Sequence, residues 1–231
     1  MLVLDEVELT QDDFRLSAHW RLPPGERVAL IGPSGAGKST LLMAIAGFFP
    51  LSAGQICWDG WPLTDLAPGD RPVSILFQDQ NLFPHLTLTQ NLGLALSPGL
   101  RLGSDERAKI EAALARVGLA GLGERRPGAL SGGQQGRAAL ARVLLQARPI
   151  LLLDEPFAAL GPALKSEMLD LVAEIAAEAG TLVLLVTHDP EDAQRFGTRT
   201  ILVSDGVAAP PTETLGLFAN PSPALRAYLG K

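Results

Sequence analysis

A glycine-rich stretch near the N-terminus carries residue types that hold phosphate groups. Residues 32–39 read GPSGAGKS and fill the spacing G-x-x-x-x-G-K-[ST]. Glycines let successive backbone N–H groups point at phosphate oxygens, and a helix N-terminus behind them adds partial positive charge. In such a loop Lys38 reaches the β- and γ-phosphates, and the Ser39 hydroxyl holds Mg²⁺. The pattern predicts a nucleoside triphosphate site, against the alternative of a glycine-rich turn that fits by chance. The predicted nucleotide-binding residues are Gly32, Pro33, Ser34, Gly35, Ala36, Gly37, Lys38, Ser39 and Thr40.

Two adjacent carboxylates follow an apolar run more than 100 residues later. The run at 150–153 is Ile-Leu-Leu-Leu, and Asp154 and Glu155 come next. A buried strand that ends in aspartate aims the carboxylate at a Mg²⁺ on the phosphates. A glutamate at the strand tip polarises the attacking water as a general base. Alone, such a pair is an ordinary loop start, but beside a phosphate loop it predicts a metal ligand and a catalytic base.

Two further polar residues stand where apolar strands end. Gln78 follows the apolar run 73–77, and its amide can touch both Mg²⁺ and the attacking water. His188 follows the run 181–187, at the edge where parallel strands end and such sheets bind ligands. A neutral imidazole there hydrogen-bonds a γ-phosphate oxygen and orients the water. The alternatives are a solvated strand-end glutamine and a capping or surface histidine.

A second anion-binding pattern lies at residues 130–134, Leu-Ser-Gly-Gly-Gln. It offers glycine amides, a hydroxyl and the start of a helix. The two phosphate-binding surfaces belong to different subdomains and need not meet within one molecule. A head-to-tail homodimer brings them together, with one copy closing the nucleotide held by the other. The residues predicted to act in this way are Ser131, Gly132, Gly133 and Gln134.

The elements that position these residues alternate between strand and helix. Apolar strands are expected at 27–31, 73–77, 150–154 and 181–186, and apolar runs without alternation favour a parallel sheet covered on both faces. Residues 2–10 and 14–22 suggest an antiparallel pair, and helical patterns dominate from 86 to 146. The remaining expected elements are helices at 38–47, 104–117, 137–147 and 162–179, a strand at 55–58, hairpin turns at 59–60 and 205–206, and short helices within 212–231. The fold class is therefore α/β, with a largely parallel core, an N-terminal antiparallel part and an inserted helical subdomain.

The overall composition restricts the class of protein and the kinds of binding partner that this chain can have. Among 231 residues the hydrophobic fraction is 47% and the formal net charge is −6, which disfavours both general disorder and a nucleic-acid partner. A single cysteine, Cys57, excludes an internal disulfide framework. The first residues do not fit a secretory signal, and no apolar run reaches the roughly 18–20 residues that span a bilayer. We therefore expect any membrane role to come through a partner.

These motifs together resemble those of ABC-type ATPases, the motor subunits of ATP-binding cassette transporters. The likeness covers nearly the whole chain, and the combination of a phosphate loop with an LSGGQ signature is highly specific. It implies a P-loop NTPase fold that forms one domain over residues 1–231, with a helical subdomain at roughly 86–146. It also implies that ATP and Mg²⁺ are sandwiched in a homodimer that is closed with ATP and open after hydrolysis. In this site Ser39, Gln78 and Asp154 hold the metal, and Glu155, His188 and Gln78 are catalytic.

The importer type fits best, because the chain is a lone ATPase domain with no fused transmembrane part. The resemblance then implies an integral membrane permease as partner, a periplasmic solute-binding protein acting indirectly, and a peripheral place on the cytoplasmic face of the bacterial inner membrane. The permease is expected in a groove near 78–90, where Phe83, Pro84 and Leu86 receive a short helix; the alternative is that these three are core residues. Residues 76–87, 90–96 and 98–102 resemble the ATPase subunits of bacterial thiamine importers.

The sequence departs from the family pattern at two places that matter for function. The loop after the base usually reads S-A-L-D, and residues 158–161 here read Ala-Ala-Leu-Gly. Gly161 thus replaces the aspartate that communicates across the dimer, which puts coupling between the two sites in doubt. No aromatic residue stands at 10–12, where the family stacks adenine. Phe14 is a substitute, or simply a core strand residue.

Three alternatives stay open. The first is an importer ATPase for another small solute, and the second is a nucleotide-gated clamp with weak hydrolysis, which Gly161 favours. The third is a soluble ABC ATPase that works on nucleic acid or ribosomes. That class predicts a coiled coil, a tandem cassette or a basic patch, and the sequence shows none of them.

Overall fold

Five parallel strands form the centre of the protein. The computed structural model describes residues 1–77, 82–158 and 160–230. The strands lie in the order β9, β3, β8, β7, β6, and each is parallel to its neighbours. Their bounds are Arg199–Ser204 for β9, Arg27–Ile31 for β3, Leu182–Val186 for β8, Ile150–Asp154 for β7 and Val73–Leu76 for β6. The parallel core predicted from the apolar runs is confirmed.

Helices cover both faces of this sheet, so its strands are apolar throughout. Leu152 and Leu184 pack in the cluster of helix α1 (Lys38–Ala46). Leu153 and Leu185 alternate with them and pack against helix α5 (Pro162–Ala179) on the other face. Burying each such leucine side chain stabilises the fold by about 1.5–3 kcal/mol.

The N-terminal part of the sheet is mostly antiparallel, as expected. Strand β1 pairs with β2 and β4, and β5 closes the edge through a hairpin. The two-residue strand β10 joins this part to the parallel core, because it pairs with both β2 and β9. The bounds are Leu2–Gln11 for β1, Phe14–Leu22 for β2, Ala53–Trp58 for β4, Trp61–Pro62 for β5, Val207–Ala208 for β10 and Thr212–Glu213 for β11, which pairs with β9.

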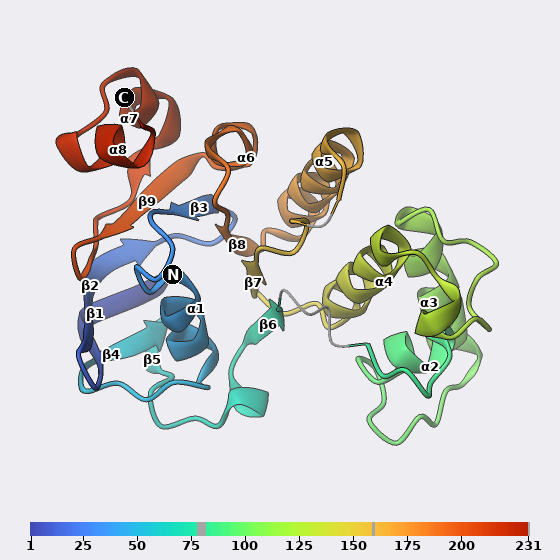
Figure 1. Cartoon of the computed structure of the whole chain (residues 1–231). Coiled ribbons are helices and arrows are strands. Elements are labelled where there is room, and N and C mark those ends of the chain that lie inside the picture. The colour runs from blue at the N-terminus through green and yellow to red at the C-terminus, as the bar shows by residue number, and fades with distance from the viewer. Residues whose placement is uncertain (78–81, 159, 231) are drawn as a thin grey trace.

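Three helices form a group with its own core, set beside the sheet beyond α5 (Figure 1). They are α2 (Leu88–Gly93), α3 (Ser104–Arg116) and α4 (Gly132–Leu145). One sequence expectation is wrong in detail. The predicted helix at 137–147 begins earlier, at Gly132, because Ser131 caps it. Helix α3 begins at Ser104, as expected, with Gly103 as its N-cap.

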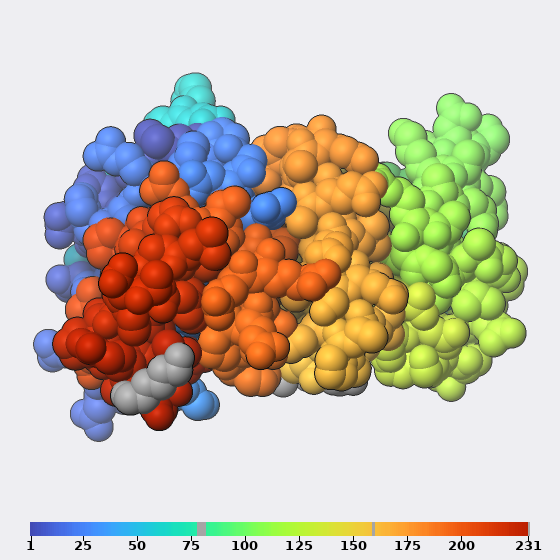
Figure 2. Space-filling view, turned by 90° about the horizontal axis from the view of Figure 1, so that it is seen from above, coloured from blue at the N-terminus to red at the C-terminus, as the bar shows by residue number. Residues whose placement is uncertain are grey.

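The remaining helices are short. They are α6 (Pro190–Phe196), α7 (Thr214–Ala219) and α8 (Pro223–Tyr228). Figure 2 shows the red C-terminal segment, with α7 and α8, at the end of the molecule opposite the green helical group, and the orange segment with α6 between it and yellow-orange α5. Short 3₁₀ turns occur at Pro68–Asp70 and Pro127–Ala129. Within the described residues, no helix has the length and apolar character needed to cross a bilayer.

Candidate functional site

The phosphate loop connects β3 to α1, and its glycines are required by space as well as by conformation. A Cβ at Gly32 would lie 2.0 Å from the carbonyl oxygen of Val203. At Gly37, the N-cap of α1 with φ of 98°, a Cβ would lie 2.7 Å from the ring of Phe14. Any side chain here would push the loop out of place or block the backbone amides. The sequence folds into this loop because no residue except glycine fits at these two positions.

Lys38 is held within the loop by carbonyl groups. Its Nζ donates to the oxygens of Gly32 and Pro33, both at 2.8 Å. The side chain is 7% exposed. Burial lowers the pKa of Lys38, and the negative charges of Glu155 and Asp154 oppose part of that shift. The ammonium group is thus poorly hydrated and ready to exchange its carbonyl contacts for phosphate oxygens.

The two described residues predicted to hold a metal meet across 115 positions of sequence. Ser39 Oγ donates to Asp154 Oδ1 at 2.8 Å. Burial raises the pKa of Asp154, the hydrogen bond from Ser39 lowers it, and the net direction is upward. Mg²⁺ takes one or two protein oxygens and completes its shell with water and phosphate, so this hydroxyl and carboxylate fit the ion. Gln78, the third predicted ligand, lies outside the described residues.

The predicted base and the predicted histidine also meet. His188 Nδ1 lies 3.0 Å from Glu155 Oε2, although His188 follows β8 and Glu155 follows β7. Glu155 adopts φ of 45°, a left-handed conformation that costs a non-glycine residue about 1–2 kcal/mol. Its backbone N–H donates to Val186 at 3.1 Å, which ties it to the adjacent strand. A strained backbone held by its neighbours keeps this carboxylate aimed at one place.

These groups line a cavity of about 560 Å³ above the phosphate loop. The predicted loop residues line it, except Pro33 and Ala36, and so do Glu155 and His188. Phe14 lines it as well, so Phe14 is a wall of the site and not only a core residue. Tyr228 was missed from the sequence, because a tyrosine more than 180 residues from the loop carries no motif.

The second predicted phosphate surface does not take part in this cavity. None of the residues that line the cavity comes from Ser131–Gln134. These four residues begin helix α4 and form a capping box, in which Gln134 N–H donates to Ser131 Oγ at 3.3 Å and Ser131 N–H donates to Gln134 Oε1 at 3.0 Å. Ser131 and Gly132 are exposed, and a Cβ at Gly132 would meet nothing within 4 Å. The start of α4 is thus capped by its own side chains, and it is exposed to solvent.

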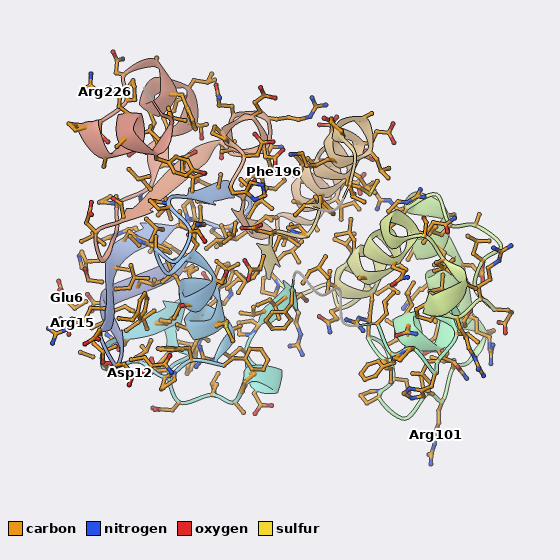
Figure 3. The ribbon with its side chains drawn as sticks, viewed as in Figure 1. Glu6, Asp12, Arg15, Arg101, Phe196 and Arg226 are labelled. Carbon is orange, nitrogen blue, oxygen red and sulfur yellow. The ribbon has the colours of Figure 1, made fainter. Side chains whose placement is uncertain are left out.

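In Figure 3, Arg101 extends outward from the loop before α3, and Arg226 extends outward from α8. The described residues hold no cluster of three or more histidine, cysteine, aspartate or glutamate side chains able to bind a metal. The phosphate loop and the strand ends beside it therefore form the best-defined chemical site among the described residues.

Comparisons with known proteins show what the whole chain is similar to. A family model described as ABC transporter matches residues 17–158. The thiamine import ATP-binding protein ThiQ of Cereibacter sphaeroides is 69% identical over 100% of both chains, and that of a Ruegeria species is 59% identical over 100% of both. A solved dimeric structure of the ATP-binding cassette MJ0796 in a post-hydrolysis state with ADP and Pi has a TM-score of 0.82 at 30% identity, covering 93% of this chain and 99% of that one. The predicted resemblance and fold class are both confirmed.

Proposed function

Because this chain belongs to the ABC transporter family and is an ATPase of that family, we propose that it energises thiamine import through an ATP-sandwich homodimer. Residues 1–231 work as one cassette, with the helical subdomain at roughly 86–146 inserted in the α/β core. The observation that carries the proposal is the meeting of Ser39 with Asp154 and of Glu155 with His188 at one cavity.

Each residue of the cavity has a role that follows from its chemistry. The loop amides and Lys38 bind the phosphates of ATP. Ser39, Asp154 and Gln78 would hold Mg²⁺, which would supply positive charge to the phosphates. Glu155 accepts a proton from the attacking water as that water reaches the γ-phosphorus. The His188 imidazole, which faces Glu155, orients the water and the γ-phosphate.

The homodimer completes the site. The cavity of one chain lacks Ser131–Gln134, and this exposed helix start offers amides and a positive dipole end to an anion. In a head-to-tail dimer each copy lays this segment on the ATP bound by the other. Hydrolysis and phosphate release then remove the charge that joins the two copies.

Two exposed aromatic residues support the proposed permease contact. Phe48 is 52% exposed and Phe83 is 45% exposed. Phe48 packs edge-to-face on Phe77 at 5.8 Å and lines a hollow of about 200 Å³ with Val73 and Ile75. Asn91 fixes the backbone of Phe83, whose N–H donates to Asn91 Oδ1 at 2.7 Å. A short permease helix docks on this surface, which places the ATPase at the cytoplasmic face of the membrane, with a periplasmic solute-binding protein acting through the permease.

Thiamine as the solute rests on the names of the relatives, because the ATPase subunit does not contact the solute. Uptake of labelled thiamine by membrane vesicles containing the complex tests this assignment. We expect ATP-dependent uptake of thiamine and none of an unrelated vitamin. Uptake of another solute without thiamine would assign the importer to that solute and leave the ATPase proposal intact.

The ATPase roles are tested by steady-state hydrolysis of the purified chain with its permease. Glu155→Gln should lower kcat about 10²–10⁴-fold, as expected for loss of a general base. The matched control is Glu174→Gln, which makes the same change on an exposed residue of α5 and should leave kcat unchanged. If wild type and Glu155→Gln are equally inactive with permease present, the protein is a nucleotide-gated clamp rather than a motor.

A further inference from the structure

Tyr228 reaches from the last turn of α8 into the nucleotide cavity. Its hydroxyl donates to the backbone carbonyl of His188 at 2.7 Å, across 40 positions of sequence. The ring also lines the cavity beside Gly32. We propose that Tyr228 is a positioning residue, which holds the His188 loop in register with the phosphate loop so that the imidazole stays against Glu155. This inference rests on the proposed roles of His188 and Glu155.

The place of Tyr228 is set by the strand that carries the phosphate loop. Helix α8 is anchored by Leu225, which is fully buried in a cluster with Ala29 and Ile31 of β3. Its N-terminus is capped by Ser222, whose Oγ accepts from the Leu225 N–H at 3.2 Å. Ile31 is the residue directly before the loop. Helix α8 and its tyrosine are therefore packed directly on the strand that leads into the phosphate loop.

The phenol stays a donor at neutral pH. Burial raises the pKa of Tyr228, a backbone hydrogen bond from Gly32 lowers it, and the charges of Asp189 and Glu155 raise it, so that the net direction is upward. The hydroxyl thus lies between the first residue of the phosphate loop and the His188 carbonyl. It links the phosphate loop to the segment that carries His188.

His188 depends on such a link because its ring is poorly enclosed. Its side chain is 66% exposed, against 25% for Glu155. An exposed imidazole keeps one orientation only if its backbone is fixed. The residue after it, Asp189, is fixed by Lys165 Nζ at 2.6 Å, and the His188 carbonyl is fixed by Tyr228. Removing the hydroxyl frees one of these two anchors and leaves the ring of Tyr228 packed.

The test is Tyr228→Phe in the full chain with its permease. Loss of one hydrogen bond that acts through His188 should lower kcat about fivefold and change the KM for ATP less than twofold. The chain has three histidines, so ¹⁵N-histidine NMR resolves them. We expect the tautomer balance of His188 to change in Tyr228→Phe, while His19 and His85 keep their wild-type signals.

Two controls separate positioning from general packing. Leu225→Val loosens the same helix without removing the hydroxyl, and it should lower the melting temperature while keeping kcat and the His188 signals. Equal effects of Leu225→Val and Tyr228→Phe on both readouts would overturn the inference. If His188→Ala is inactive while Tyr228→Phe matches wild type, the positioning role of Tyr228 is overturned and the role of His188 stands. If His188→Ala is fully active, the proposed role of His188 itself is wrong.

Discussion

The phosphate loop and the LSGGQ segment both present backbone amides at the start of a helix, yet the protein encloses one and exposes the other. At Gly32 a Cβ would strike Val203 at 2.0 Å, and Lys38 is nearly fully buried. At Gly132 a Cβ would meet nothing, and Ser131 is exposed. The chain's own core encloses the first surface, and the second surface is exposed, as the proposed homodimer requires.

The hydrogen bonds of the two segments differ in the same way. Ser131 and Gln134 bond each other across three positions. Ser39 bonds Asp154 across 115 positions, and Glu155 contacts His188 across 33. Substitutions in the LSGGQ segment should therefore affect function with little cost to folding. Substitutions around the phosphate loop should affect both.

The largest expected effect comes from disabling each surface in turn. Lys38→Ala removes the phosphate-binding ammonium, and Gly132→Glu places a negative charge where the partner's phosphates would bind. Each variant alone should hydrolyse ATP about 10²–10³-fold more slowly than wild type, which is the usual effect of removing one electrostatic donor from an active site. Gly132→Glu should keep or raise the melting temperature, because an acid in the first turn favours the helix.

Mixing these two variants tests whether the site is shared. Half of randomly formed dimers pair one variant with the other, and each such dimer has one intact site of two, so about a quarter of wild-type activity should return. Gly128→Glu is the matched control, since it adds the same charge at a neighbouring open position outside the segment. Mixed dimers with no more activity than the separate variants would contradict a site built by two copies.

A second prediction compares an enclosed ion-pair group next to His188 with an exposed group between helices α3 and α5. Lys165 Nζ lies 2.6 Å from Asp189 and 2.8 Å from Asp192, and these side chains are largely enclosed. Lys165→Met should destabilise the protein by about 1–3 kcal/mol, because it leaves two largely enclosed carboxylates without their cationic partner. Arg116→Met, which removes exposed contacts with Glu174 and Glu178, should cost less than about 1 kcal/mol. Urea unfolding checks both, and equal costs would contradict the contrast.

Much of the phosphate-loop region can be predicted from sequence because its chemistry depends on spacing. The loop glycines, Asp154 and Glu155 follow apolar strands, and parallel strands bring their carboxyl ends to one edge. The contacts Ser39–Asp154 and Glu155–His188 confirm that these residues meet. The catalytic and metal-binding roles assigned to them stay predictions.

The parts that sequence does not reveal depend on tertiary contacts. The start of α4 at Gly132 is hidden because glycines read as loop, although the capping box of Ser131 and Gln134 makes them helical. Tyr228 sits in a short C-terminal helix, and only the packing of Leu225 under β3 brings its hydroxyl to His188. Ser131 followed three residues later by Gln134 was the one signal that could have placed the helix correctly.

A third prediction uses two carboxyl groups whose pKa values shift in opposite directions. The pKa of Asp154 is raised above 3.8 by burial, so its favourable contribution is present below that pH and is lost as pH rises through the folded pKa. Asp154→Asn should therefore exceed wild type in melting temperature at pH 7, and the gap should shrink as the pH falls through the raised folded pKa and be gone below about pH 4.

Asp189 is the control with the reverse sign. The hydrogen bond from Lys165 lowers the pKa of Asp189 below 3.8, so its contribution is present above that pH and is lost as pH falls through the folded pKa. Asp189→Asn should be less stable than wild type at pH 7, and the deficit should shrink in acid. Melting curves from pH 3 to 8 distinguish the two residues, and shifts of the same sign would contradict this assignment.

The smallest expected effect lies at Gly161, where α5 begins without the cap that α4 has. Gly161 has φ of −66° and ψ of 155°, the backbone of an N-cap, but no side chain that accepts from the helix. A Cβ there meets nothing within 4 Å, so an aspartate fits and its oxygen accepts from the first-turn amides.

Gly161→Asp should stabilise the protein by only a few tenths of a kcal/mol, whereas Gly161→Ala should lie about 1 kcal/mol below it. If the missing carboxylate also limits communication between the two ATP sites, the Hill coefficient for ATP should rise in Gly161→Asp and not in Gly161→Ala. A gain in stability without that rise would mean that Gly161 limits only the helix start.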